Sequence, residues 1–182
     1  MDIWQDMQTA LSALEAKKLL RTPVTLESPA GPRVRVGDRE VVCFCSNDYL
    51  SLANDPALRN AVTSAVEAWG IGSGASRLVS GTMQPHKQFE AQLAAFKHTE
   101  AAVLTPTGWM ANHVAIRALA GANDLILCDK LNHASILEAA GGNAPGKKSA
   151  VMRTYPHGNL ERLETLLQKY RDQYRRCLIV TD

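Results

Sequence analysis

The chain has 182 residues, enough for a domain with a hydrophobic core of ordinary size. Its 20 basic and 18 acidic residues leave a net charge of +2, which does not indicate nucleic acid or an anionic membrane as a partner. No apolar stretch approaches the roughly 20 residues that a membrane helix needs, and the N-terminus lacks the basic and apolar segments of a signal peptide. We therefore expect a cytoplasmic protein.

The first third of the chain predicts a helix, a pair of short strands and a second helix. An amphipathic helix is expected over 3–20, with Pro23 as its stop. Short β segments follow at 33–36 and 40–45, separated by a Gly-Asp turn. In Asp55-Pro56, aspartate suits the N-cap and proline suits the first helical position of the next helix.

This second helix is expected to run to about Trp69 and to end at Gly70. The glycine- and serine-rich residues 70–81 predict an irregular loop, and a helix is expected over 84–97. Strands then alternate with helices, which indicates βαβ units and a parallel sheet. The strands are expected at 101–106, 124–128, 150–154 and 177–181, and the helices at 109–119, 134–140 and 159–174.

Four cysteines stand at positions 43, 45, 128 and 177. Cys43 and Cys45 alternate in an apolar run, so on a strand they would share one face. No CxxC occurs, and the histidines show no zinc-ligand spacing, so we expect no metal site. The cysteines are interpreted as buried thiols in a reducing compartment.

Two glycine motifs are rejected as nucleotide sites. Gly70-Ile71-Gly72-Ser73-Gly74 follows a helix, whereas a dinucleotide fingerprint must follow a strand. Gly141 to Lys147 matches GxxxxGK, but residue 148 is lysine where a P-loop needs serine or threonine for magnesium. That segment also follows a predicted helix and precedes a predicted strand, whereas a P-loop follows a strand and precedes a helix.

Thr107-Gly108-Trp109 lies where the strand at 101–106 would meet the following helix. A helix N-terminus offers free N–H groups that suit a phosphate, and glycine lets a ligand approach the backbone closely. An ordinary turn with a core tryptophan is the alternative. His133 opens the helix after strand 124–128 and should share the sheet edge with Gly108; it could stack on a planar ligand, or simply cap the helix.

Five stretches together resemble the α-oxoamine synthases, a family of pyridoxal-phosphate enzymes of fold type I. They occur in the family's order and spacing: CSNDYLSL at 45–52, GIGSGASRLVSGT at 70–82, HKQFE at 86–90, TPTGWMAN at 105–112 and CDKLNHASILEA at 128–139. The resemblance implies an α/β fold: an incomplete three-layer αβα large domain over 46–182, preceded by an N-terminal helix and β segment over 1–45.

The resemblance also implies roles for individual residues. Thr107, Gly108 and Trp109 would bind the phosphate and ring region of pyridoxal 5'-phosphate, with Thr107 in place of a usual serine and Trp109 in place of a frequent phenylalanine. His133 would stack on the cofactor ring and touch the amino-acid substrate. Arg21 matches an acyl-substrate contact. Asn47 would lie near the substrate, although Asn47-Asp48 could equally be a local turn.

Family members condense an amino acid with an acyl thioester and lose carbon dioxide, as homodimers with active sites between subunits. SNDYL, LNHAS and LIVTD most resemble the biotin-pathway member, which joins L-alanine to a pimeloyl thioester of CoA or acyl carrier protein. Members that use glycine remain an alternative. The catalytic lysine of the family comes after the strand that ends here at Asp182, so we expect this chain alone to be inactive. A non-catalytic binding or assembly module is the other alternative.

Overall fold

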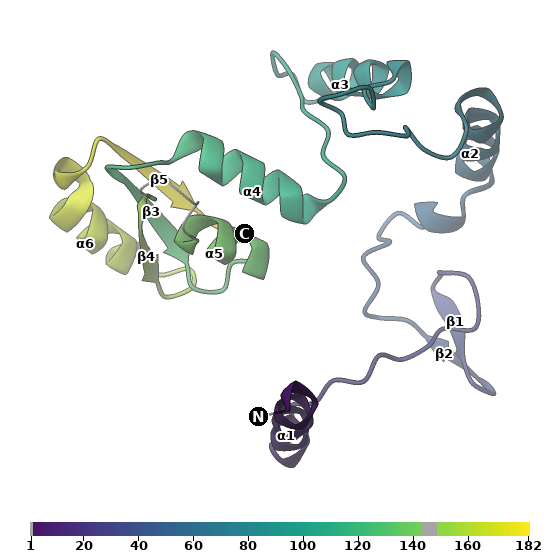
Figure 1. Ribbon diagram of the computed structural model, residues 1–182, viewed down its shortest axis with the longest axis horizontal. Helices are drawn as coiled ribbons and strands as arrows, with labels where there is room; N and C mark the ends of the chain where they lie inside the picture. Colours follow the sequence, from purple (N-terminus) through teal and green to yellow (C-terminus); the bar gives the residue numbers. More distant parts are fainter. Residues whose placement is uncertain (1, 143–148) are drawn as a thin grey trace. The chain divides into compact units, whose positions relative to one another are not determined.

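The computed structural model describes residues 2–142 and 149–182. Two compact units divide the chain, Met1–Ser76 and Arg77–Asp182. The domain boundary predicted between residues 45 and 46 stays a prediction. Figure 1 labels the helices and strands of both units.

The first unit begins with helix α1 (Ile3–Ala16), none of whose residues is buried. The Asp2 carboxylate caps it by accepting from the amide of Trp4 at 3.1 Å. The prediction that α1 extends to residue 20 and stops at Pro23 is wrong. Lys18 has a left-handed φ of 56°, and the Leu19 amide donates to the Leu14 carbonyl, so the helix closes several residues before the proline.

An antiparallel hairpin follows, formed by β1 (Arg33–Val36) and β2 (Arg39–Val42). Pairing starts at Arg33 opposite Val42, and Pro32 before it has no amide hydrogen to continue the ladder. The strand predicted at 40–45 therefore ends at Val42. As a consequence, Cys45 is exposed and Cys43 half-buried, and the prediction of buried thiols is wrong for Cys45.

Helix α2 (Pro56–Trp69) follows a short 3-10 turn, η1 (Leu52–Asn54). The Asp55 carboxylate accepts from the amides of Ala57 and Leu58, and Gly70 ends the helix with φ 77°. Both predicted ends are confirmed. The residues from 70 to 81 are described without helix or strand, as predicted.

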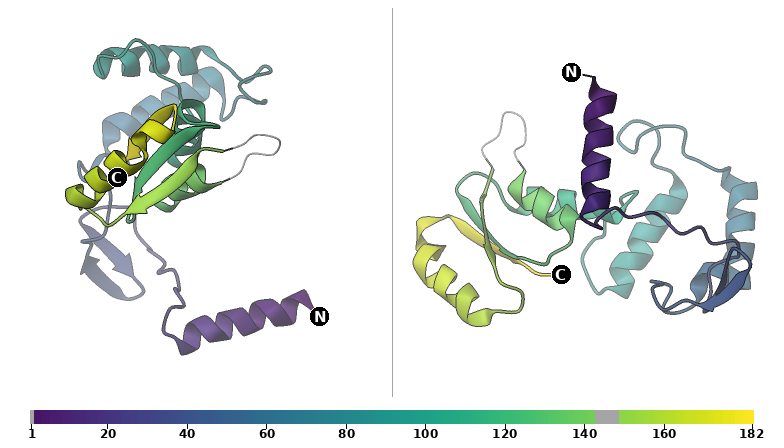
Figure 2. Two further views of the ribbon diagram at one scale, coloured as in Figure 1. Left: turned by 90° about the vertical axis from the view of Figure 1, so that its left-hand side faces the viewer. Right: turned by 90° about the horizontal axis from the view of Figure 1, so that it is seen from below.

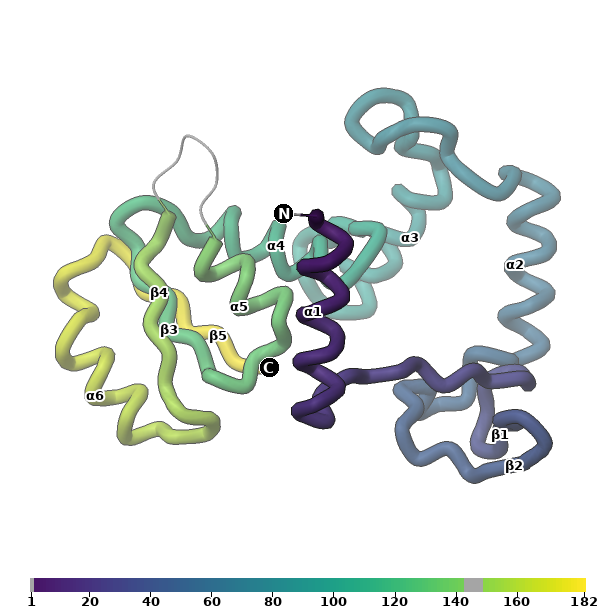
Figure 3. Tube along the Cα trace, turned by 60° about the horizontal axis from the view of Figure 1, so that its bottom comes forward, coloured from purple at the N-terminus to yellow at the C-terminus, as the bar shows by residue number. Residues whose placement is uncertain are grey.

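The second unit contains α3 (Gln84–Phe96) and a three-layer αβα arrangement. Its elements, in order, are α4 (Gly108–Leu119), β3 (Asp124–Asp129), α5 (Ala134–Gly141), β4 (Val151–Tyr155), α6 (Leu160–Tyr170), the 3-10 turn η2 (Arg171–Gln173) and β5 (Arg176–Val180). Figure 3 traces this order along the chain. The segment that resembles a P-loop does follow α5 and precede β4, but its residues 143–148 lie outside the described ones.

The sheet has the order β4-β3-β5, and both pairings are parallel, as predicted. Helices α4 and α5 cover one face and α6 covers the other (Figures 1 and 2). Ile126 and Cys128 pack toward α4 and α5, whereas Leu125 and Leu127 pack toward Leu166 of α6. All six residues of β3 are buried, because this strand lies in the centre of the sheet with helices on both faces.

The strand predicted at 101–106 is absent from the part of the chain that the structure describes, and this prediction is wrong. Both backbone groups of Leu104 bind side chains instead of a neighbouring strand: the amide donates to Glu90 Oε1 at 3.0 Å, and the carbonyl accepts from Arg77 Nη1 at 3.1 Å. Pro106 has no amide hydrogen to offer a ladder.

Candidate functional site

The N-terminus of α4 presents Thr107, Gly108 and Trp109. Thr107 caps the helix, since its Oγ1 accepts from the Met110 amide at 3.1 Å. The amides of Gly108 and Trp109 have no acceptor within the helix itself. A Cβ atom placed on Gly108 would meet nothing within 4 Å, so the space beside this residue is open. Trp109 is 45% exposed, which excludes the alternative of a core tryptophan.

His133 is the N-cap of α5, so the predicted capping role is confirmed. Its Nδ1 accepts from the Ser135 amide at 3.2 Å and lies 2.7 Å from Ser135 Oγ. A ring that accepts at Nδ1 carries its proton on Nε2 when it is neutral. His133 is exposed as a residue.

A hydrogen-bonded link joins the two helix N-termini. Asn112 of α4 donates from Nδ2 to Ser135 Oγ of α5 at 2.8 Å, and Ser135 is fully buried. The rings of Trp109 and His133 meet edge to face, with centroids 6.4 Å apart. Trp109 also stacks on His113 at 5.6 Å. The structure thus brings together the four residues expected at the cofactor, although no strand precedes Thr107.

The turn that carries His133 is held at the carboxyl ends of the strands. Asn132 Nδ2 donates to the Val180 carbonyl at 2.9 Å, and the His133 amide donates to Asp182 Oδ2 at 3.1 Å. These two contacts fix the turn to the end of β5. His133 is therefore held by hydrogen bonds of the residues before and after it as well as by its own amide and ring.

Asp129, at the end of β3, fixes the start of the same turn. Its carboxylate accepts from the amides of Leu131 at 2.8 Å and Gly158 at 3.1 Å, and it lies 3.0 Å from His157 Nδ1. Burial alone would raise the pKa of Asp129, but the two amides and His157 bring it below its usual value. The ionised carboxylate joins the loops after β3 and β4.

Arg21 and Asn47 lie in the first unit, and both are exposed. Around Asn47 the local turn is confirmed: the Ser46 hydroxyl accepts from the Asp48 amide at 3.0 Å, and Asp48 Oδ1 accepts from the amides of Leu52 and Ala53. The positions of these two residues relative to Gly108 and His133 stay a prediction.

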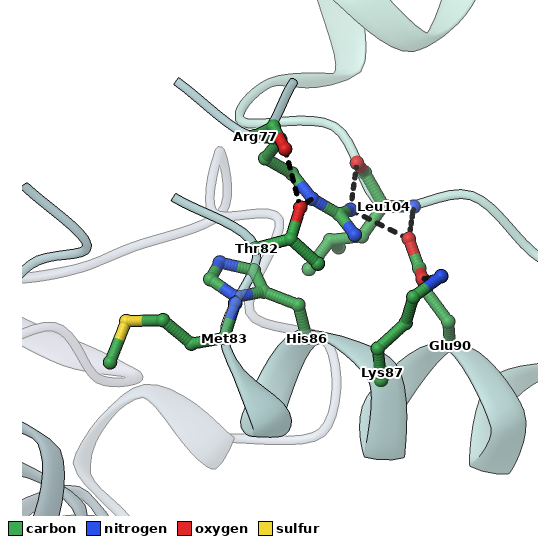
Figure 4. Close-up of polar contacts among 7 residues, drawn as sticks. All are labelled: Arg77, Thr82, Met83, His86, Lys87, Glu90 and Leu104. Carbon is green, nitrogen blue, oxygen red and sulfur yellow. Dashed lines mark hydrogen bonds and ion pairs between the residues drawn. The ribbon is translucent and has the colours of Figure 1, made fainter. Parts of the chain in front are cut away.

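A second polar cluster joins residues of α3 to the segments before and after this helix (Figure 4). Arg77 Nη1 donates to Glu90 Oε1 at 2.6 Å, and the same pair binds both backbone groups of Leu104. The Thr82 hydroxyl donates to the Arg77 carbonyl at 2.7 Å. Lys87 Nζ lies farther from the carboxylate, 3.4 Å from Glu90 Oε2.

The Arg77–Glu90 pair holds the segment that leads to α4. The hydrogen bond from Arg77, followed by that from the Leu104 amide, lowers the pKa of buried Glu90 to about 2. Glu90 therefore stays ionised at neutral pH and retains both contacts. From Leu104 the chain continues to Thr105, whose hydroxyl donates to the Thr107 carbonyl at 2.9 Å, so the pair positions the start of α4.

The sequence motifs contain several residues whose structural roles were not predicted: Asn112, Ser135, Asp182, Arg77 and Glu90. Each stands inside or beside a quoted stretch, but its partner lies far along the chain, and spacing alone does not reveal such pairings. Among the described residues, no cluster of three or more His, Cys, Asp or Glu side chains is arranged to hold a metal. No helix in the described part combines the length and apolar character needed to cross a membrane.

Comparison with known proteins adds three findings. Residues 39–182 match the family model for aminotransferase class I and II. Curated enzymes named 8-amino-7-oxononanoate synthase are 42% identical in Herminiimonas arsenicoxydans, over 99% of this chain and 45% of that protein, and 45% identical in Geobacter sulfurreducens, over 94% and 42%. The chain thus spans less than half the length of these relatives.

Solved structures show a corresponding likeness. Serine palmitoyltransferase from Sphingomonas wittichii has a TM-score of 0.84 and 26% identity, covering 98% of this chain and 45% of that one. A structure described as SPT with PLP has a TM-score of 0.79 and 25% identity, covering 92% and 42%.

Proposed function

Because the chain belongs to the aminotransferase class I and II family, we propose that it forms the cofactor-binding part of an enzyme that makes 8-amino-7-oxononanoate, in the biotin pathway, from L-alanine and a pimeloyl thioester. The fold is that of a fold-type-I pyridoxal-phosphate enzyme, present here as a partial αβα domain. The observation that carries the proposal is the 42% identity over nearly the whole chain to a synthase of this name. The palmitoyltransferase, at 26%, is less similar in sequence.

The residues at the N-termini of α4 and α5 fit pyridoxal phosphate. The space beside Gly108 is open, and the first amides of α4 have no acceptor within the helix, so a phosphate dianion would be a suitable acceptor for them. The hydroxyl of Thr107 accepts from Met110 and still has its own hydrogen to donate. When bound, the cofactor would supply an electron sink for a carbanion at the amino-acid Cα.

His133 would form one wall of this cofactor site. Its ring can stack on a flat heterocycle, and an Nε2–H group can donate to a substrate carboxylate. Ser135 and Asn112 hold the ring in that orientation, while Trp109 limits the space beside it. These contacts would exclude water from one side of the reacting atoms.

The remaining residues and partners belong to the same proposal. Arg21 would contact the acyl substrate and Asn47 would lie near the amino acid. The complete protein would be a cytoplasmic homodimer whose cofactor domain begins near residue 46. The lysine that binds the cofactor covalently would be supplied beyond Asp182, so this chain alone should release no free thiol from a pimeloyl thioester.

The test uses the complete protein that contains this chain. Gly108→Val should weaken pyridoxal phosphate binding, measured from the visible absorbance of the bound cofactor, because the new side chain fills the approach path. Gly121→Val is the matched control, since a Cβ there also meets nothing within 4 Å but lies at the far end of α4. Equal binding by wild type and Gly108→Val would refute the cofactor site.

His133→Ala tests the side of the proposed cofactor site that His133 would form. We expect turnover, measured by thiol release, to fall more than cofactor content, because stacking and substrate contact matter most during the reaction. His98→Ala offers a control at an exposed histidine that follows α3. Unchanged turnover in His133→Ala would remove this residue from the site.

A further inference from the structure

Cys43 and Cys45 form a close pair of thiols in the first unit. They follow β2, separated by Phe44, and their Sγ atoms lie 4.0 Å apart. Cys43 is half-buried and Cys45 is exposed. The cofactor site proposed above uses neither of them, and they do not contribute to a core cluster.

The backbone on both sides of the pair is fixed. Before it, the Cys43 amide donates to the Pro32 carbonyl at 2.9 Å. After it, the Asp48 carboxylate accepts from the amides of Leu52 at 2.8 Å and Ala53 at 3.2 Å. The chain between these points bends at residues 44 and 45, and the two Sγ atoms come within 4.0 Å of each other. A disulfide requires sulfur atoms about 2.05 Å apart, so side-chain rotation has to close a gap of roughly 2 Å.

We propose that Cys43 and Cys45 form a redox-active dithiol that a peroxide converts into an intramolecular disulfide. The exposed Cys45 thiol attacks one peroxide oxygen, which gives a sulfenic acid and one water when hydrogen peroxide is the oxidant. The Cys43 sulfur then attacks the Cys45 sulfur, the S–S bond forms and the hydroxyl leaves as a second water. The two thiols lose two protons and two electrons, and the peroxide is reduced to two waters.

The other two thiols are poor competitors for the oxidant. Cys128 is fully buried in the centre of the sheet, and burial raises its pKa to about 11. Cys177 is half-buried on β5, and burial raises its pKa as well. Since the thiolate is the reactive form, both should react slowly with a peroxide.

The bridge should be easy to reduce again. It closes a ring that contains only one intervening residue, and a strained disulfide is reduced more readily than a relaxed one. Transient bridges of this kind are the ones found in reducing compartments. Asn47 stands two residues after Cys45, so closure would move the backbone that carries it; this consequence alone rests on the proposed function.

The test measures thiol chemistry and needs no enzymatic activity. The purified chain is treated with hydrogen peroxide, alkylated, digested with trypsin and analysed by mass spectrometry. Cleavage after Arg39 and Arg59 releases one peptide that contains both cysteines. We expect this peptide to be two hydrogens lighter and not alkylated, and dithiothreitol to restore alkylation at both cysteines.

Single-residue variants distinguish the Cys43–Cys45 disulfide from other products of oxidation. Cys43→Ser should leave a Cys45 sulfenic acid that dimedone traps, and Cys177→Ser should form the bridge as wild type does. The proposal is overturned if the wild-type peptide gains oxygen atoms at Cys45 while Cys43 remains alkylated. Disulfides between chains in place of the internal bridge would overturn it too. Either result leaves the proposed synthase function untouched.

Discussion

Two apolar segments of the second unit look alike in sequence and fold differently. β3 and residues 101–106 both follow a helix, and both are rich in aliphatic residues. β3 pairs with β4 on one side and β5 on the other, and every residue of it is buried. In the segment 101–106, Val103 is 76% exposed, and Leu104 bonds to Arg77 and Glu90.

This difference shows that a β pattern becomes a strand only where a neighbouring strand accepts its hydrogen bonds. Backbone groups must find partners in any case. For Leu104 the Arg77–Glu90 pair supplies both partners: Glu90 accepts from the backbone amide, and Arg77 donates to the backbone carbonyl. Stability in β3 should therefore depend on apolar packing, and in 101–106 on the Arg77–Glu90 pair.

The largest effect is expected from the centre of the sheet. Leu127→Ala removes a fully buried side chain packed between β3 and α6, and should lower the free energy of unfolding by about 2–5 kcal/mol. Val103→Ala, an aliphatic truncation in the other segment, should change it by less than about 0.5 kcal/mol. Urea denaturation measures both. Similar losses in the two variants would contradict the contrast between the segments.

Glu90→Ala should release the segment 101–106. It removes the acceptor of the Leu104 amide and the partner of Arg77 together. We expect hydrogen exchange at the Leu104 amide to accelerate by about tenfold or more, since a factor of ten corresponds to about 1.4 kcal/mol of lost protection. Exchange within β3 should stay slow. Glu100→Ala, at an exposed position, is the control, and unchanged exchange at Leu104 would show that the pair does not hold this segment.

Much of the fold follows from local sequence signals. Asp55-Pro56 and Gly70 delimit α2 as expected, because capping depends on residues within one helical turn. The alternation of strands and helices after residue 107 predicts the parallel sheet and its two helical layers, because the apolar residues there recur with the spacing of a strand or of a helix. The failures at 101–106 and at residue 45 share a cause: each depends on a hydrogen-bond partner, or the lack of one, outside the local pattern. The end of α1 has a different cause, the left-handed backbone at Lys18.

The candidate site shows the same limit. Gly108 and His133 were predictable because each opens a helix beside the sheet, and the structure places the rings of Trp109 and His133 in contact. Ser135 and Asn112, which link these helices, were not assigned a role, because their contact spans 23 positions in sequence. The roles of Arg21 and Asn47 rest on the family resemblance alone.

The pH dependence of stability should distinguish the charged pair from apolar packing. The pKa of Glu90 falls from its usual 4.5 in the unfolded chain to about 2, so its contribution is complete above about pH 5 and is lost as pH decreases toward 2. The stability difference between wild type and Glu90→Gln should therefore shrink over this range. Asp124 titrates in the same range but is present in both proteins, so its effect cancels. A difference that stays constant from pH 5 to pH 2 would contradict the role of the ionised carboxylate.

The smallest effect is expected from Lys87, the second cation near Glu90. Its Nζ lies 3.4 Å from Oε2, and its side chain is 66% exposed, whereas that of Arg77 is 30% exposed. An exposed ammonium remains hydrated and gains little from a neighbouring carboxylate, and salt screens what it gains. Lys87→Ala should leave the urea midpoint and the Leu104 exchange rate unchanged, whereas Arg77→Ala should alter both. If the two variants behaved alike, net charge around Glu90 would hold the segment, and the directed bonds from Arg77 to Glu90 and to the Leu104 carbonyl would not be needed to explain its position.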